Sequence, residues 1–178
     1  MRPHLEHVFS RLDRARADLR AAVDAVPPSV RRTRPAADRW STAEVVEHLS
    51  MVERLFTERI ANELQPRIAA LQPETAARTM LPEAIEARMA DRVNRREAPD
   101  TARPTGACSC DEAWARLEDG HERLRTIVRA ADGLALGEVT LEHRFFGTLT
   151  IYQWIELMAA HEGRHTEQIR EIATTLAV

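Results

Sequence analysis

Four long stretches of this chain carry apolar residues at steps of three and four, which is the spacing of one face of an α-helix. They cover residues 4–23, 38–64, 111–131 and 151–176. Charged residues fill the positions between them, so each stretch is expected to bury one stripe and to expose the rest. Four such helices within 178 residues predict one domain, residues 1–178, with an all-α, four-helix-bundle fold.

Local signals mark where the first helix ends and the second begins. Pro27 and Pro28 end the first helix, because proline lacks the amide hydrogen that a helix interior needs. Ser41 or Thr42 is expected to cap the second helix, with Glu44 in the position that completes a capping box. These signals support two separate helices joined by a linker.

The segment between the second and third helices, residues 66–110, lacks the regular spacing. It contains several prolines and one shorter helical candidate, residues 82–96. A bare loop of this length is uncommon in a compact domain. We therefore predict an inserted segment of irregular structure with a short helix. The stretch 137–150 has few helix formers and is predicted to be an extended connection into the last helix.

All 25 basic residues are arginine, since the chain contains no lysine. Schiff-base catalysis and the phosphate-binding lysine of P-loop enzymes are therefore excluded. The formal net charge of -3 and a pI near 6.2 argue against a nucleic-acid partner. The charged N-terminal stretch resembles neither a signal peptide nor a membrane span, so we expect a cytoplasmic protein without a membrane partner.

Two cysteines, Cys108 and Cys110, stand one residue apart. A disulfide across so short a loop would be strained, and a C-x-C pair without a second pair is weak evidence for a metal site. We interpret both as loop thiols, with a redox or metal role as the alternative.

The last helix contains His161, Glu162 and His165, which match the zinc-protease pattern H-E-x-x-H. Residues four apart lie on the same face of a helix, so the two imidazoles could bind one metal ion. The extended protease pattern also requires glycine at 168 and histidine at 171, where this chain has Gln168 and Glu171. Glu162 points about 100° away around the helix. The spacing favours a metal site, but the protease hypothesis lacks its third ligand unless Glu171 or an upstream residue takes that place.

His48 is the best candidate for a third ligand. It lies in the apolar stripe of the second helix, and facing stripes of a bundle supply metal ligands from different helices. Three histidines would leave coordination positions open, as in a reactive site. The alternative is that each is a hydrogen-bonded core residue. We expect His4, His7 and His121 on the surface, whereas His143 could lie behind the ligands.

Two motifs of the chain resemble the DinB-like superfamily. One is RWSTAEVVEHL, and the other is HRFFGTLTIYQWIELMAAHEGRHTEQI; residues 66–110 carry none of the resemblance. The resemblance implies an up-up-down-down four-helix bundle that holds a divalent metal with His48, His161 and His165. Some proteins of this family are transferases or isomerases that depend on the low-molecular-weight thiols bacillithiol or mycothiol.

The resemblance and the residues together predict a divalent metal ion (Zn, Ni or Fe) and a low-molecular-weight thiol as cofactors. The metal would lower the pKa of the bound thiol, and the protein would act as a thiol-dependent S-transferase on a small molecule. Two alternatives stay open. One is a metal-binding stress or interaction protein without turnover, which could be a homodimer. The other is a metal-dependent hydrolase with Glu162 as the base.

Three further residues near the motifs have two interpretations each, and Gly163 has one. Arg164 either holds a carboxylate of the thiol or, as we favour, forms a solvent-facing ion pair. Trp40 and Trp154 either line a pocket or, as we favour, pack in the core. Gly163 lies in a helix interior, where glycine is unfavourable, so a neighbouring group is expected close to its backbone.

Overall fold

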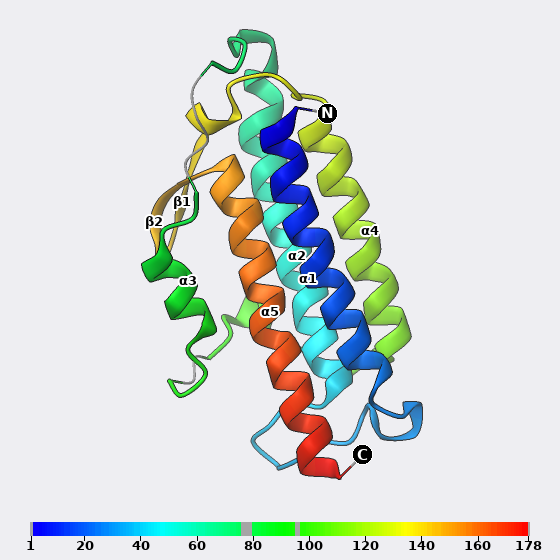
Figure 1. The fold of residues 1–178 in the computed structure, drawn as a ribbon. Coiled ribbons are helices and arrows are strands. Elements are labelled where there is room, and N and C mark those ends of the chain that lie inside the picture. Colours follow the sequence, from blue (N-terminus) through cyan, green and yellow to red (C-terminus); the bar gives the residue numbers. More distant parts are fainter. Residues whose placement is uncertain (1, 76–79, 95–96, 178) are drawn as a thin grey trace.

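The computed structural model describes residues 2–75, 80–94 and 97–177. Four long helices form a bundle (Figure 1), which confirms the predicted fold class. They are α1 (Pro3–Asp24), α2 (Thr42–Leu64), α4 (Cys110–Arg129) and α5 (Ile151–Leu176). A short helix, α3 (Glu83–Ala90), and two strands, β1 (Thr140–His143) and β2 (Gly147–Thr150), complete the regular elements, with 3-10 turns at Pro28–Val30, Gln65–Ala70, Asp100–Ala102 and Leu136–Glu138.

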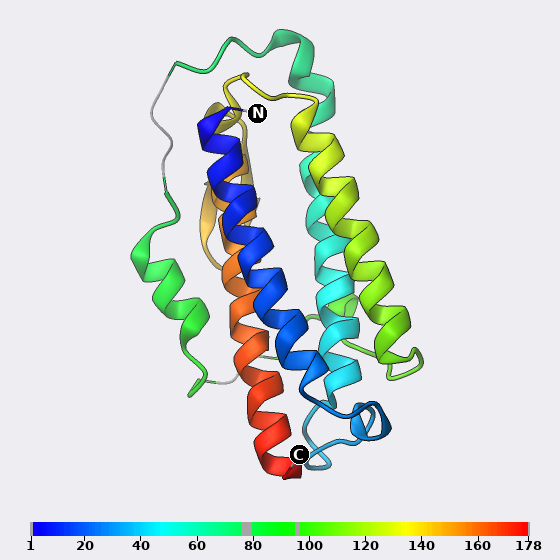
Figure 2. The ribbon, with the colours of Figure 1, turned by 45° about the vertical axis from the view of Figure 1, so that its right-hand side comes forward.

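The chain direction reverses at two of the three connections between the long helices. Figure 2 shows α1 and α5 running one way, and α2 and α4 the other way. Helix α1 packs against α5, and α2 packs against α4. The up-up-down-down order implied by the resemblance is therefore wrong, because that order needs two long crossovers and this bundle has one. The inserted segment is that crossover, since it returns the chain from the end of α2 to the start of α4 at the opposite end of the bundle.

The second and last helices begin with capping boxes. The Ser41 hydroxyl accepts the amide hydrogen of Glu44, and the Glu44 carboxylate accepts that of Ser41. Thr150 and Gln153 form the same exchange at the start of α5. Each box satisfies amide groups that the first turn of a helix leaves unpaired. The predicted cap of the second helix is confirmed, and α4 starts in the same way at Ser109.

Helix α3 runs along the outside of α5 (Figure 1). It is shorter than the predicted 82–96, because it ends at Ala90, and residues 95–96 of that prediction lie outside the described residues. Arg164 of α5 donates hydrogen bonds to the backbone carbonyls of Met89 and Asp91. Our preference for a solvent-facing ion pair at Arg164 was therefore wrong: its half-buried side chain fastens the end of α3 to α5.

Strands β1 and β2 form an antiparallel hairpin before α5, with Thr140 paired to Thr150 and His143 to Gly147. The extended connection predicted for this stretch is confirmed. Gly147 has a φ of 72°, a conformation that favours glycine and allows the tight reversal of the chain.

A polar layer divides the core into two hydrophobic clusters. On α1, Arg16 lies between Leu12 of one cluster and Leu19 of the other. On α5, Glu162 and His165 lie at the corresponding level and are buried. Because buried polar groups need partners, this layer is where the chemistry of the bundle is expected.

Both cysteines are buried, and Cys108 lies in the loop before α4 as predicted. Cys110 is the first residue of α4, and both pack in the second cluster as free thiols. Burial raises the pKa of Cys110 to about 11, so its thiol is a weak nucleophile. The interpretation of Cys110 as a loop thiol was wrong. Within residues 2–75, 80–94 and 97–177, no helix combines the length and the apolar character that crossing a bilayer requires.

Candidate metal centre

The structure brings His48, His161 and His165 together. His48 projects from α2 and the other two from adjacent turns of α5. One ring nitrogen from each lies within 4.8 Å of the others. Residues 113 positions apart in the chain thus meet in the polar layer, because α2 and α5 turn their apolar faces toward each other.

Contacts on the far side of two rings fix which nitrogen faces the centre. His48 Nδ1 lies 2.7 Å from the carbonyl oxygen of Ala102, and His165 Nδ1 lies 2.8 Å from Oε1 of Gln168. An oxygen of this kind accepts only, so both Nδ1 atoms carry the proton in the neutral rings and both Nε2 atoms present lone pairs to the centre. Lone pairs that converge in this way require a shared proton or a cation between them.

The distances fit a cation. His161 Nε2 lies 3.4 Å from His48 Nε2 and 3.1 Å from His165 Nε2. Two nitrogens that each lie about 2.1 Å from one ion are separated by about 3.0–3.4 Å for coordination angles between octahedral and tetrahedral. The donor set of the three side chains, the tautomers of His48 and His165 and the two Nε2–Nε2 distances therefore match a divalent-metal site.

Burial keeps the three rings neutral. It lowers the pKa of His48, although the bond to Ala102 opposes the shift. It lowers the pKa of His161 and of His165 well below the ordinary value, and the neighbouring histidines act in the same direction. Neutral imidazole is the form that binds a metal, so no proton has to be displaced from these rings near neutral pH.

The ring of Trp40 borders two of the three histidines. The Trp40 ring centroid lies 4.9 Å from that of His48 and 6.5 Å from that of His165. Trp40 is half-buried, so it covers one side of the centre as well as packing on the second cluster. Trp154 is fully buried, which confirms its interpretation as a core residue.

His143 lies outside the centre, in an aromatic cluster with Phe56, Phe146 and Trp154. Its Nδ1 accepts the amide hydrogen of Phe145. Burial, together with nearby arginines, lowers the pKa of His143 to about 4. The contacts that orient His48 and His165 thus come from Ala102 and Gln168 rather than from His143.

Glu162 does not join the three histidines. Its carboxylate is buried in a bidentate ion pair with Arg16 of α1, with Nη2 to Oε1 at 2.5 Å. The prediction that Glu162 points away from its neighbouring ligand is confirmed. Gly163 has open space where a Cβ would lie, so the expected close approach to its backbone is wrong.

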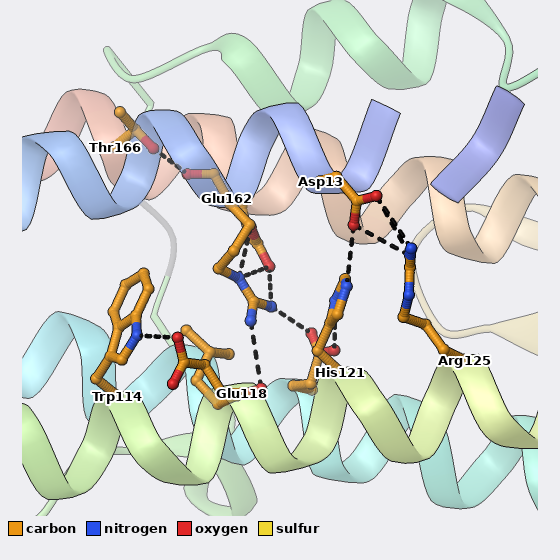
Figure 3. A network of polar contacts seen from close by, with 10 residues as sticks. Asp13, Trp114, Glu118, His121, Arg125, Glu162 and Thr166 are labelled. Carbon is orange, nitrogen blue, oxygen red and sulfur yellow. Dashed lines mark hydrogen bonds and ion pairs between the residues drawn. The ribbon is translucent and has the colours of Figure 1, made fainter. Parts of the chain in front are cut away.

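His121 belongs to the same buried polar layer. Figure 3 shows it reaching from α4 toward Asp13 of α1, next to Arg125. Its Nε2 lies 3.1 Å from Asp13 Oδ1, and its Nδ1 faces Glu53 Oε1 at 3.8 Å. The expected surface position of His121 is therefore wrong, because Gly120 beside it lets α4 approach α2. His7 is exposed as predicted, and His4 is half-buried.

Sequence reasoning missed Ala102 and Gln168. Ala102 acts through its backbone, so no side-chain signal could identify it. Gln168 had a usable signal, since it stands three residues after His165, where a helix places its side chain within reach of the ring.

Comparisons with known proteins agree with this fold. The model of the DinB superfamily matches residues 11–169. A protein of Bacillus subtilis (strain 168), the uncharacterized protein YuaE, is 28% identical over 144 residues, which is 78% of this chain and 80% of that protein.

Two solved structures share the bundle. YfiT from Bacillus subtilis, described as a probable metal-dependent hydrolase with an unusual four-helix bundle topology, is 17% identical with a TM-score of 0.64, over 99% of this chain and 90% of its own. TT2238, described as a four-helix bundle protein, is 20% identical with a TM-score of 0.58, over 94% of this chain and 98% of its own. Since the family match extends over nearly the whole chain, the protein belongs to the DinB superfamily.

Proposed function

We propose that the protein is a divalent-metal-dependent S-transferase, in which His48, His161 and His165 hold the ion and a low-molecular-weight thiol is the nucleophile. The observation that carries the proposal is the convergence of three Nε2 atoms at 3.1–3.4 Å along the two measured edges, with two of the rings oriented by acceptors behind them. A structural zinc site would use four protein ligands, whereas three leave room for a substrate atom.

The residues of the chain supply orientation and a dry environment. His48, His161 and His165 would hold a divalent ion through neutral imidazoles, and the chemistry that such an ion would supply is a lower pKa for a thiol bound beside it. Ala102 and Gln168 keep two rings in the required tautomer, and Trp40 excludes water from one side. In the transfer, the sulfur bonds to the electrophilic carbon, the leaving group departs with its electron pair, and the thiol proton is released to water.

Hydrolysis is the second candidate, and the description of YfiT as a probable metal-dependent hydrolase favours it. Water would then take the place of the thiol. The role of base is a poor fit for Glu162, because both of its oxygens accept hydrogen bonds from Arg16. A hydrolase built on this site would be expected to keep its activity in Glu162→Gln.

The test combines metal content with thiol transfer. The wild-type protein is purified, loaded with Zn, Ni or Fe, and assayed for conjugation of mycothiol or bacillithiol to a panel of electrophiles. His48→Ala should lose both the metal and the activity, whereas His7→Ala, an exposed histidine on α1, should keep both. Metal binding without any thiol conjugation would reject the transferase, and hydrolysis of ester or amide substrates by the same sample would establish the alternative.

A further inference from the structure

A small cavity lies between α2 and α5, beside His161 and the buried charges of the polar layer. Leu49, Val52 and Met158 form its apolar walls, and its polar lining is Glu53, His161 and Glu162. Its volume is about 10 Å³. That is close to the space that one buried water needs, and such a water requires two to four polar partners. The cavity therefore has the size and the lining to hold one water molecule.

His161 differs from the other two histidines in the contacts of its Nδ1 atom. His48 and His165 each direct Nδ1 to an oxygen acceptor. Nδ1 of His161 has no hydrogen-bond partner in the part of the chain that the structure describes. A metal-binding histidine nearly always donates its other N–H to a carboxylate, a carbonyl or a water. His161 lines the cavity, so the missing acceptor is expected there.

We propose that Glu53 positions His161 for metal binding through one water molecule held in the cavity between them. The inference rests on the proposed metal site, and it adds a positioning residue from α2 that has no place in the H-E-x-x-H pattern. The water would accept the N–H of His161 and donate to the Glu53 carboxyl group.

Glu53 is better suited to this role than Glu162. Both oxygens of Glu162 are taken by Arg16 at 2.5–3.1 Å. Glu53 Oε2 has a longer contact to Arg16, at 3.4 Å, and Glu53 Oε1 has no hydrogen-bond partner among the described residues, since His121 Nδ1 stays 3.8 Å away. The Glu53 side chain is only 4% exposed, so its Oε1 is a buried acceptor that still lacks a hydrogen bond.

Helix α4 holds Glu53 in place. A Cβ built on Gly120 would lie 2.8 Å from Glu53 Cγ, so only glycine allows the side chain to pass at this level. Glycine is unfavourable inside a helix, and the close approach accounts for its presence here. His121, next in the chain, directs Nδ1 toward Glu53 from 3.8 Å.

The experiment measures zinc affinity by competition with a chelating dye. Glu53→Leu keeps the approximate size and removes both oxygens, and its zinc affinity should fall by about 10–100-fold, as for loss of other groups that orient metal ligands. Glu53→Gln can still bond to the water and should stay within about threefold of wild type. Glu58→Gln, an exposed residue of the same helix, is the matched control and should not change the affinity.

Thermal unfolding without metal separates positioning from stability. Glu53→Leu should unfold at or above the wild-type temperature, because an apolar side chain replaces a poorly paired buried acid. Gly120→Ala displaces Glu53 without changing it, and should also weaken zinc binding. The inference would be overturned if Glu53→Leu bound zinc with wild-type affinity. It would also be overturned if Glu53→Leu and Glu53→Gln lost zinc affinity equally and both had lower melting temperatures. Failure of the wild-type protein to bind zinc would instead reject the proposed metal site.

Discussion

The pH dependence of stability provides a direct test of the polar layer, through the variant Glu53→Gln. Burial raises the pKa of Glu53 from 4.5 to about 8, with the charge of Glu162 acting in the same direction and Arg16 opposing it. In the folded protein the group thus keeps a proton that the unfolded chain loses above about pH 4.5. Unfolding releases that proton, so the free energy of unfolding falls as the pH rises from about 4.5 to about 8.

The magnitude follows from the number of protons. One proton released on unfolding changes the free energy of unfolding by about 1.4 kcal/mol per pH unit. Between about pH 5 and pH 7 the wild-type protein should therefore lose about 2–3 kcal/mol through Glu53. Glutamine has the same shape and no titrating proton, so the variant should escape this loss. The buried histidines titrate in both proteins, and the difference between the two isolates Glu53.

Urea denaturation of the metal-free proteins, followed by circular dichroism from about pH 5 to pH 8, measures this difference. Relative to wild type, the free energy of unfolding of Glu53→Gln should rise with pH. Glu58→Gln removes an exposed carboxylate that pairs with Arg54 on the same helix, so its curve should run parallel to wild type. If the curve of Glu53→Gln also runs parallel to wild type, the Glu53 carboxyl is ionised in the fold and the reasoning is refuted.

Three further predictions concern other parts of the molecule. Arg16→Met leaves Glu162 buried without its bidentate partner and should lower the free energy of unfolding by about 3–5 kcal/mol in urea; a loss below about 1 kcal/mol would contradict the ion pair. Thr150→Ala removes the cap of α5 and should cost about 1 kcal/mol, or about 2–4 °C in melting temperature, and an unchanged melting curve would speak against the capping box. Zinc at about 100 times its Kd should stabilise the wild-type protein by about 2.7 kcal/mol but should leave His48→Ala unchanged, and equal stabilisation of both would place the ion elsewhere.

The helical parts of the structure could be predicted from the sequence because their signals are local. Apolar spacing located the four long helices, and the residues around Ser41 fixed where α2 begins. The same spacing placed His48 and His165 on apolar faces, and a bundle turns such faces inward. The fold and the meeting of the three histidines therefore followed from periodicity.

The polar layer could not be predicted in the same way, because its partners are distant in the chain. Glu162 and Arg16 are 146 positions apart, and no spacing rule links them. His121 stands among charged residues, which suggested a surface, yet the missing side chain of Gly120 lets α4 pack close to Glu53 of α2, and His121 is buried there. Charged residues on a helix indicate an exposed face unless a neighbouring helix places opposite charges against them.

The contact between His48 and Ala102 gives the inserted segment an influence on the proposed centre. The atom that holds the ring is a main-chain oxygen, so the contact depends on the path of the chain, while the 1% exposure of Ala102 restricts position 102 itself to small side chains. Related proteins could differ at the exposed positions of this stretch and still orient the imidazole alike. A small shift of the main chain at Ala102 would tilt the His48 ring and so change the reactivity of a bound ion, although the ligands themselves stay the same.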